Sequence, residues 1–211
     1  MDFQCIYNNF KDHACIQEEQ KNPFFKKATE EDLKNLTSIY EICLAHSPVW
    51  EEDDLSALKE IVIPAQLVNF YQELNPNNLP MNDAGIYLAN LQRIREEYIS
   101  LEPGCYLVTW GFLVIGTTIG GDPVLLDLNE ADLPVYLAEH TILFGEGHRG
   151  NVDLSFGFPP DALQAEFGDN PIPVTYETIK KCLHLIETQF DVFIEKMSCN
   201  QYPDLEEELL Q

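Results

Sequence analysis

The residues that could carry out chemistry in this sequence form no specific catalytic motif. GEGHRG at 145–150 matches GxGxxG, a pattern whose glycines bring the backbone close to a pyrophosphate at the start of a helix. The following stretch, NVDLSFGFPP, indicates a strand or a loop and no βαβ unit surrounds it, so we interpret the match as coincidental. A Walker-type phosphate loop, a GxSxG elbow and an HExxH helix are all missing from the sequence.

Acid–base and nucleophilic pairs are equally unspecific. His140 could act as a general base, but we favour a strand-end histidine that is hydrogen-bonded within the fold. Cys182 and His184 are two residues apart and would point in different directions on a helix. Asp122 and Asp127 could suggest the carboxylate pair of a glycoside hydrolase, yet with 36 acids in 211 residues such pairs arise by chance. We therefore predict that the protein is not an enzyme and has no catalytic residues.

Metal-ligand spacings are weak as well. His13 and Cys15 are too few for a zinc site, and no CxxC pair accompanies them. The carboxylates at 122, 127, 130 and 132 do not follow the spacing of an EF-hand loop, although opportunistic calcium binding stays open. We predict no metal and no cofactor.

The charge of the chain is its most informative property. Thirty-six acidic side chains stand against 12 basic ones, which gives a formal net charge of -24. Nucleic acids and anionic membrane surfaces would repel such a protein, so we predict neither as a partner. Between Glu97 and Ile179 there are thirteen acids and a single base, Arg149, and this surface should attract a basic protein. The alternative is that the charge only keeps the protein soluble.

The elements that must position these residues are helices at both ends and strands between them. Thr29 and Asp32 resemble a capping box before an apolar helical repeat, and Pro64 suits the first position of another helix. The first predicted helix covers 29–45, the second runs from Pro64 to about 75, the third uses Leu88 to Tyr98, and a long final helix covers 175–197.

Strands are predicted from Cys105 onwards, where Val, Ile, Leu, Thr and Tyr dominate. Residues 112–119 and 124–128 flank the turn 120–122, whose glycines allow a tight hairpin, and a third strand is expected at 133–137. The fold class is therefore α+β: an antiparallel meander sheet of about four to six strands, packed against helices from both ends of the chain. The start of the sequence has no signal-peptide pattern, no stretch reaches 18 apolar residues, and the six cysteines are scattered, so we expect a cytoplasmic protein with free thiols.

Four motifs together resemble the SUKH superfamily of Smi/Knr-type domains. They are IPAQLVNFYQELN at 63–75, WGFLVIGTTIGGDPVLLDL at 110–128, PVYLAEH at 134–140 and FDVFIEKM at 190–197. The resemblance implies an α+β domain that works by binding another protein. Bacterial members are typically immunity proteins that neutralise a toxin, often a nuclease, whereas fungal members regulate cell-wall synthesis and signalling. The first fifty residues and the insertion-like stretch 141–175 have no counterpart in the family pattern.

We accordingly divide the chain into an N-terminal helical extension (1–50) packed on the domain, a SUKH-like domain (51–200) and an acidic tail (201–211). The expected function is that of an immunity protein that neutralises a basic toxin, such as a nuclease, by occluding its active face. The alternative is an adaptor or regulatory module of cell-wall or signalling assemblies without a toxin partner. The glycine-rich loop at 145–151 is either a partner contact or a flexible connection. The predicted partner surface comprises Asp122, Asp127, Glu130, Asp132, Glu139 and Glu146.

Overall fold

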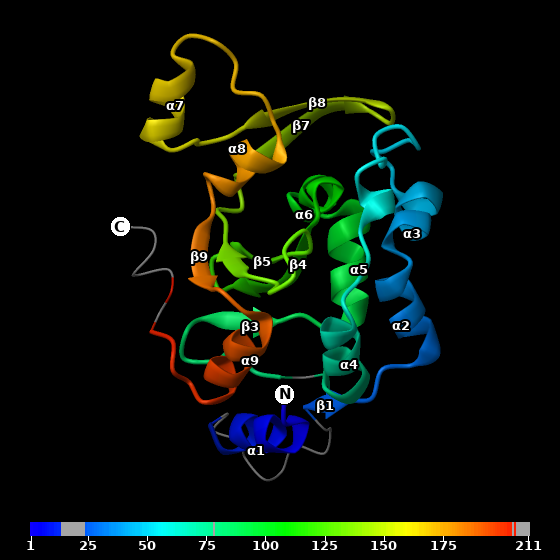
Figure 1. Cartoon of the computed structure of the whole chain (residues 1–211), viewed down its shortest axis with the longest axis vertical. Helices are drawn as coiled ribbons and strands as arrows, with labels where there is room; N and C mark the ends of the chain where they lie inside the picture. Colours follow the sequence, from blue (N-terminus) through cyan, green and yellow to red (C-terminus); the bar gives the residue numbers. More distant parts are fainter. Residues whose placement is uncertain (14–23, 78, 204, 206–211) are drawn as a thin grey trace.

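The computed structural model describes residues 1–13, 24–77, 79–203 and 205. Its centre is a five-stranded antiparallel sheet in the order β3-β4-β5-β6-β9, with helices packed around it (Figure 1). The predicted α+β class and antiparallel sheet are confirmed. The strands are β3 (Ile86–Leu88), β4 (Phe112–Thr118), β5 (Pro123–Asp127), β6 (Val135–Leu137) and β9 (His184–Glu187).

The β4–β5 hairpin lies in the middle of this sheet, where the sequence predicts it. Gly121 adopts a φ of 93°, and its N–H donates to the carbonyl oxygen of Thr118 across the turn. Glycine adopts this left-handed conformation without the steric penalty of a side chain. Every residue of β5 is buried, because the sheet is covered on both faces. The third predicted strand is present as β6 and is shorter than expected.

Helices of the N-terminal half pack beside the sheet, on the right in Figure 1. The predicted capping box is confirmed: Thr29 Oγ1 accepts from the N–H of Asp32, and the Asp32 carboxylate accepts from the N–H of Thr29. The expected helix over 29–45 is interrupted at Ser38, whose φ of -119° and ψ of 38° are not helical. The elements are α2 (Glu30–Thr37), α3 (Ile39–His46), η1 (Leu58–Glu60), α4 (Ala65–Glu73) and α5 (Leu91–Ser100).

The prediction of one long helix over 175–197 is wrong. This segment forms α8 (Tyr176–Lys180), then β9, then α9 (Phe190–Ser198). The residues 184–187 pair with β6, whose outer edge would otherwise leave backbone N–H and C=O groups without partners. Apolar residues of both helices still reach the core. The apolar repeat that suggested one long helix therefore belongs to two short helices separated by a strand.

The N-terminal residues pack on the same core. α1 (Phe3–His13) lies against α9, and β1 (Phe25–Lys26) pairs with β2 (Asn75–Pro76). Phe10 and Leu36 belong to one continuous cluster of buried side chains with the sheet. The boundaries at residues 50 and 200 stay predictions, and most of the tail 201–211 lies outside the described residues.

Another two-stranded sheet forms an arch above the main one in Figure 1. β7 (Leu143–His148) and β8 (Asn151–Phe156) pair as an antiparallel hairpin, and α7 (Asp161–Phe167) follows at its far end. α6 (Gly104–Leu107) and the 3-10 helix η2 (Val108–Trp110) lie beneath the arch. In the described part of the chain, none of the helices combines the length and apolarity needed to cross a membrane.

Candidate functional site

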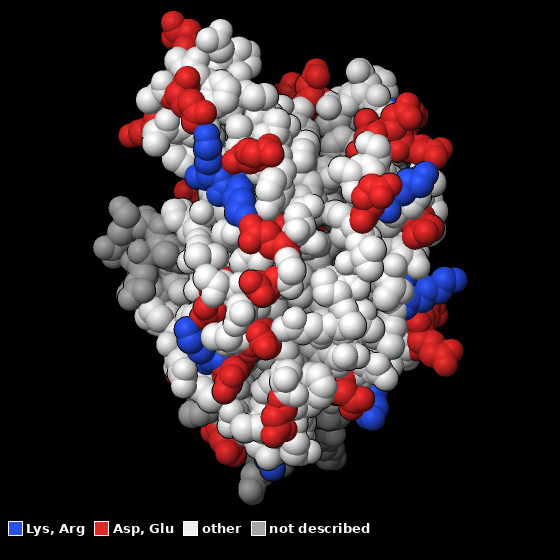
Figure 2. Space-filling model, viewed as in Figure 1, with Lys and Arg blue, Asp and Glu red and all other residues white. Residues whose placement is uncertain are grey.

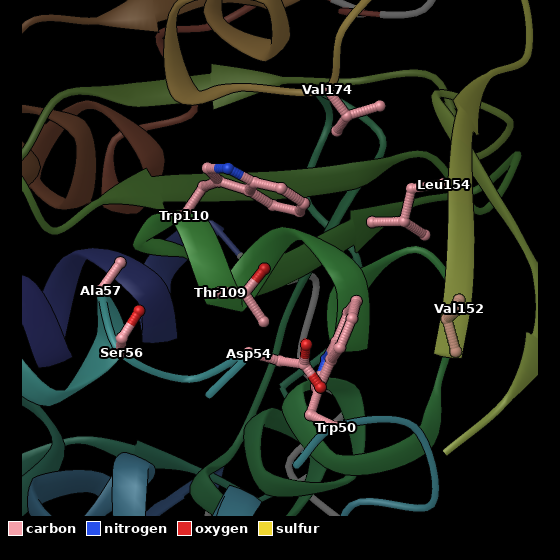
Figure 3. A pocket seen from close by; sticks show the side chains of 9 residues that line it. All are labelled: Trp50, Asp54, Ser56, Ala57, Thr109, Trp110, Val152, Leu154 and Val174. Atoms are coloured by element: carbon pink, nitrogen blue, oxygen red, sulfur yellow. The ribbon is translucent and has the colours of Figure 1, made fainter. Parts of the chain in front are cut away.

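A groove of about 490 Å³ opens where the β7–β8 hairpin passes over η2 and the loop after α3 (Figure 3). We call it the tryptophan groove, because both tryptophans of the chain line it. Four separate segments of the chain build it. Its lining residues are Trp50, Asp54, Ser56, Ala57, Thr109, Trp110, Val152, Leu154 and Val174.

Trp50 is held rigidly at one end of the groove. The hydroxyl of Ser47 accepts hydrogen bonds from the N–H groups of Val49 and Trp50, which turns the chain just after α3. The indole N–H of Trp50 donates to the carbonyl oxygen of Cys105 over 2.7 Å. Its ring meets Tyr106 edge-on at a centroid distance of 6.1 Å. A buried indole with a satisfied N–H is a stable wall for the groove.

Trp110 forms another wall and is held from behind. Gly111 ends η2 with a φ of 81°, and a side chain at this position would collide with the Asn129 amide, since its Cβ would lie 2.4 Å from Nδ2. The same amide donates to the carbonyl oxygen of Trp110 over 2.8 Å. The ring of Trp110 is half-buried and points across the groove, above Thr109. Its exposed face can therefore contact a ligand.

The tip of the β7–β8 hairpin is fastened to the loop after α3. Arg149 donates from Nε to the carbonyl oxygen of Trp50 and from a terminal nitrogen to that of Leu44, both over 3.2 Å. The N–H of Gly150 donates to the carbonyl oxygen of Val49. This places Val152 of β8 over the groove. The loop 145–151 is thus the docked end of a hairpin. Strand β8 follows it directly, so the GxGxxG match lacks the helix start that a dinucleotide site requires.

Four exposed acids, residues 51–54, border the groove. Acidic side chains gather at the upper right of Figure 2, over the segment that follows α3 in Figure 1. Asp54 lines the groove itself, and its Oδ2 accepts from the N–H of Glu51 over 2.9 Å. The groove therefore combines indole surface with negative charge.

The structure corrects two members of the predicted partner surface. Asp122 is buried, and its Oδ1 accepts from the backbone N–H of His140 at 2.8 Å and lies 2.9 Å from Nδ1 of the same residue. Asp127 is completely buried and accepts from the hydroxyl of Tyr176 at 2.6 Å. Internally paired, buried carboxylates cannot contact a partner, so both residues serve the fold. His140 is the hydrogen-bonded strand-end histidine that the sequence suggested.

The other four predicted residues remain near the surface but do not surround the groove. Glu130 and Asp132 are exposed in the turn after β5, where Glu130 pairs with Lys180. Glu139 is half-buried after β6, and Glu146 is exposed on β7. Sequence reasoning missed Trp50 and Trp110 as site residues. The available signal was a tryptophan followed directly by the acidic run EEDD.

Burial raises the pKa values of three cysteine thiols and of the Tyr176 hydroxyl, which keeps these groups protonated. Burial, followed by the charge of Glu139, raises the pKa of the Cys182 thiol to about 11. Burial raises the pKa values of Cys43 and Cys105 to about 12. These thiols are therefore protonated near neutral pH and poor nucleophiles. Burial and the hydrogen bond to the Asp127 carboxylate raise the pKa of Tyr176, so its hydroxyl stays a donor.

No group of three or more His, Cys, Asp or Glu side chains in the described ranges is arranged to hold a metal ion. Cys15, which the sequence paired with His13, lies outside those ranges. No family model, curated protein or solved structure matches this chain. The geometry of the groove and the charge around it are therefore the main guides to function.

Proposed function

We propose that this chain is a protein-binding domain whose partner is a basic polypeptide held at the tryptophan groove. The observation that carries the proposal is the groove of about 490 Å³, which both tryptophans line beside an exposed acidic run. Aromatic side chains are frequent anchors at the centre of protein interfaces, whereas charges at the rim steer the partner. The groove offers both within one surface.

Charge complementarity indicates a basic partner. The net charge is -24, and the acids next to the groove, residues 51–54, are all exposed. Glu130, Asp132, Glu139 and Glu146 add negative charge elsewhere on the surface, although Lys180 partly neutralises Glu130. Complementary fields raise association rates above the unsteered value of about 10⁵ to 10⁶ M⁻¹s⁻¹. An acidic protein with an aromatic groove is suited to fast capture of a basic polypeptide.

Among basic polypeptides we put a toxin first, so that the chain would act as an immunity protein. Support comes from the resemblance of residues 63–75, 110–128, 134–140 and 190–197 to the SUKH superfamily. A nuclease toxin is typically basic because its substrate is anionic, so an acidic protein can cover the face that binds the substrate. We place this function in the cytoplasm, in line with the free thiols among the described cysteines.

The test is co-purification from the native host with a matched pair of variants. Tagged wild type, Trp110→Ala and Tyr87→Ala are each washed at low and then moderate salt, and the retained polypeptides are identified by mass spectrometry. Tyr87 is an exposed aromatic residue on β3 that does not line the groove, so it controls for the general loss of an aromatic ring. Circular dichroism confirms that each variant is folded.

We expect one basic polypeptide that is retained by wild type and Tyr87→Ala, lost with Trp110→Ala, and released as salt rises. Reconstitution with the purified polypeptide should then show inhibition of its toxic activity. A retained polypeptide without toxic activity would instead support the adaptor or regulatory module. Equal retention by wild type and Trp110→Ala, or retention of acidic polypeptides only, would reject binding at the groove.

A further inference from the structure

We infer that the tryptophan groove holds an arginine side chain of the partner, with its guanidinium between the ring of Trp110 and the carboxylate of Asp54. This inference rests on the proposed function and names the group that the groove recognises. It follows from the unusual combination of an indole face, a carboxylate and apolar walls in one cavity.

The carboxylate of Asp54 lacks a basic partner within the described chain. Its Oδ2 accepts one hydrogen bond, from the backbone N–H of Glu51, and no described side chain donates to Oδ1. None of the ion pairs among the described residues includes Asp54. Because Asp54 lines the cavity, a cation that entered it would meet an acceptor with a free oxygen. Asp54 therefore favours a positively charged ligand group.

The indole of Trp110 selects the shape of that group. Its face is partly exposed, and it lies across the groove from Val152 and Leu154. Tryptophan is the strongest cation–π partner, and a planar guanidinium can stack on it while its N–H groups remain in the plane for hydrogen bonding. The hydroxyl oxygens of Ser56 and Thr109 line the same cavity and can accept from those N–H groups.

An arginine fits this set of groups better than a lysine. A guanidinium carries five N–H donors in a flat fork that matches a carboxylate, whereas an ammonium is a strongly hydrated point charge. The methylene stem of arginine can lie along the apolar side chains of Val152, Leu154 and Val174. Arg149, next to the groove, is bound differently, because it donates to the backbone carbonyl oxygens of Trp50 and Leu44.

The test is a titration of the full chain with three small probes, in which binding is measured by the intrinsic tryptophan fluorescence. The probes are the Nα-acetyl methylamides of arginine, citrulline and lysine. Citrulline has the shape of arginine without its charge. Both tryptophans of the chain line the groove, so the fluorescence reports directly on the site. The variants are Asp54→Asn, which keeps an oxygen for the Glu51 N–H, and Asp53→Asn, which makes the same charge change at an exposed neighbour that does not line the groove.

We expect a saturable fluorescence change with the arginine probe, an affinity about tenfold higher than that for citrulline, and weaker binding of lysine. Asp54→Asn should lower the affinity for the arginine probe about tenfold, and Asp53→Asn should leave it nearly unchanged. Equal affinities for arginine and citrulline, equal effects of the two variants, or no saturable change with arginine would each overturn the inference.

The titration needs no partner, so its failure is distinct from failure of the proposed function. A polypeptide retained by wild type and Asp54→Asn alike, but lost with Trp110→Ala, would keep the proposed function and overturn the arginine assignment. Selective binding of the arginine probe without any retained polypeptide would support the arginine site and count against the proposed function.

Discussion

Replacement of Asp127 by alanine should destabilise the protein strongly, although the sequence alone placed this residue on a partner surface. The side chain is completely buried. Its carboxylate accepts from the hydroxyl of Tyr176 at 2.6 Å, from the backbone and side-chain nitrogens of Asn129 at 3.0 and 3.1 Å, and lies 3.4 Å from Nζ of Lys180. Removal of the carboxylate would take this buried acceptor from all of these donors, while Lys180 would keep Glu130 and the Asn129 amide would keep the carbonyl oxygen of Trp110.

Each hydrogen bond to a charged group typically contributes about 1.5 to 3 kcal/mol, so loss of the bonds to this carboxylate should cost about 3 to 5 kcal/mol of a total stability of about 5 to 15 kcal/mol. For a chain of 211 residues, this corresponds to a fall in melting temperature of roughly 10 °C. Asp127→Asn keeps one oxygen but loses the charge, so we expect a smaller cost of about 1.5 to 3 kcal/mol. Urea unfolding followed by circular dichroism measures each difference.

Asp132→Ala is the matched control, because Asp132 is an exposed acid in the same connection between β5 and β6. Exposed substitutions of this kind usually change the free energy of unfolding by less than about 0.5 kcal/mol. If Asp127→Ala proved as mild as Asp132→Ala and instead weakened binding of a partner, the buried network would be refuted as the role of Asp127.

Two further predictions concern the wall of the groove and the edge of the sheet. Gly111→Ala should cost roughly 2 to 3 kcal/mol of unfolding free energy, about 1 kcal/mol more than Gly121→Ala. Both residues have a positive φ, but only at Gly111 would the new side chain collide with a neighbour, the Asn129 amide. Equal urea midpoints for the two variants would contradict this. Burial alone would raise the pKa of Glu187, but hydrogen bonds, foremost from Lys196, hold this pKa below the ordinary 4.5. Because protonation of Glu187 removes this stabilisation, wild type should lose stability as pH falls below about 5, and Glu187→Gln should lose less. Parallel stability curves for wild type and Glu187→Gln between pH 7 and 3 would contradict the lowered pKa.

Local signals explain which elements could be predicted. The Thr29–Asp32 capping box and the glycine turn at 120–122 depend on residues within a few positions of one another, and both are present. The long helix over 175–197 failed for a non-local reason. Its apolar repeat is compatible with α8 and α9, but residues 184–187 complete the hydrogen bonding of β6, which lies about fifty positions earlier.

The site was harder to predict, because burial and proximity are tertiary properties. An aspartate at the end of a buried strand has the same sequence pattern whether its side chain faces solvent or a distant tyrosine. The partner of Asp127 is Tyr176, and the partner of Asp122 is His140, and neither pairing has a local signal. In the same way, Trp50 and Trp110 become one surface only when the β7–β8 hairpin docks beside them.

The amino-acid sequence by itself determined the net charge, the three strands β4, β5 and β6 and the glycine turn between β4 and β5, since ionisation and backbone preference belong to residue types and near neighbours. Only the tertiary structure decided which acids are buried in hydrogen-bonded pairs and which, like residues 51–54, stay exposed beside two indoles. The physical reason is that the environment of a carboxylate depends on groups brought to it by folding, and this environment separates a structural acid from one that can bind a cation.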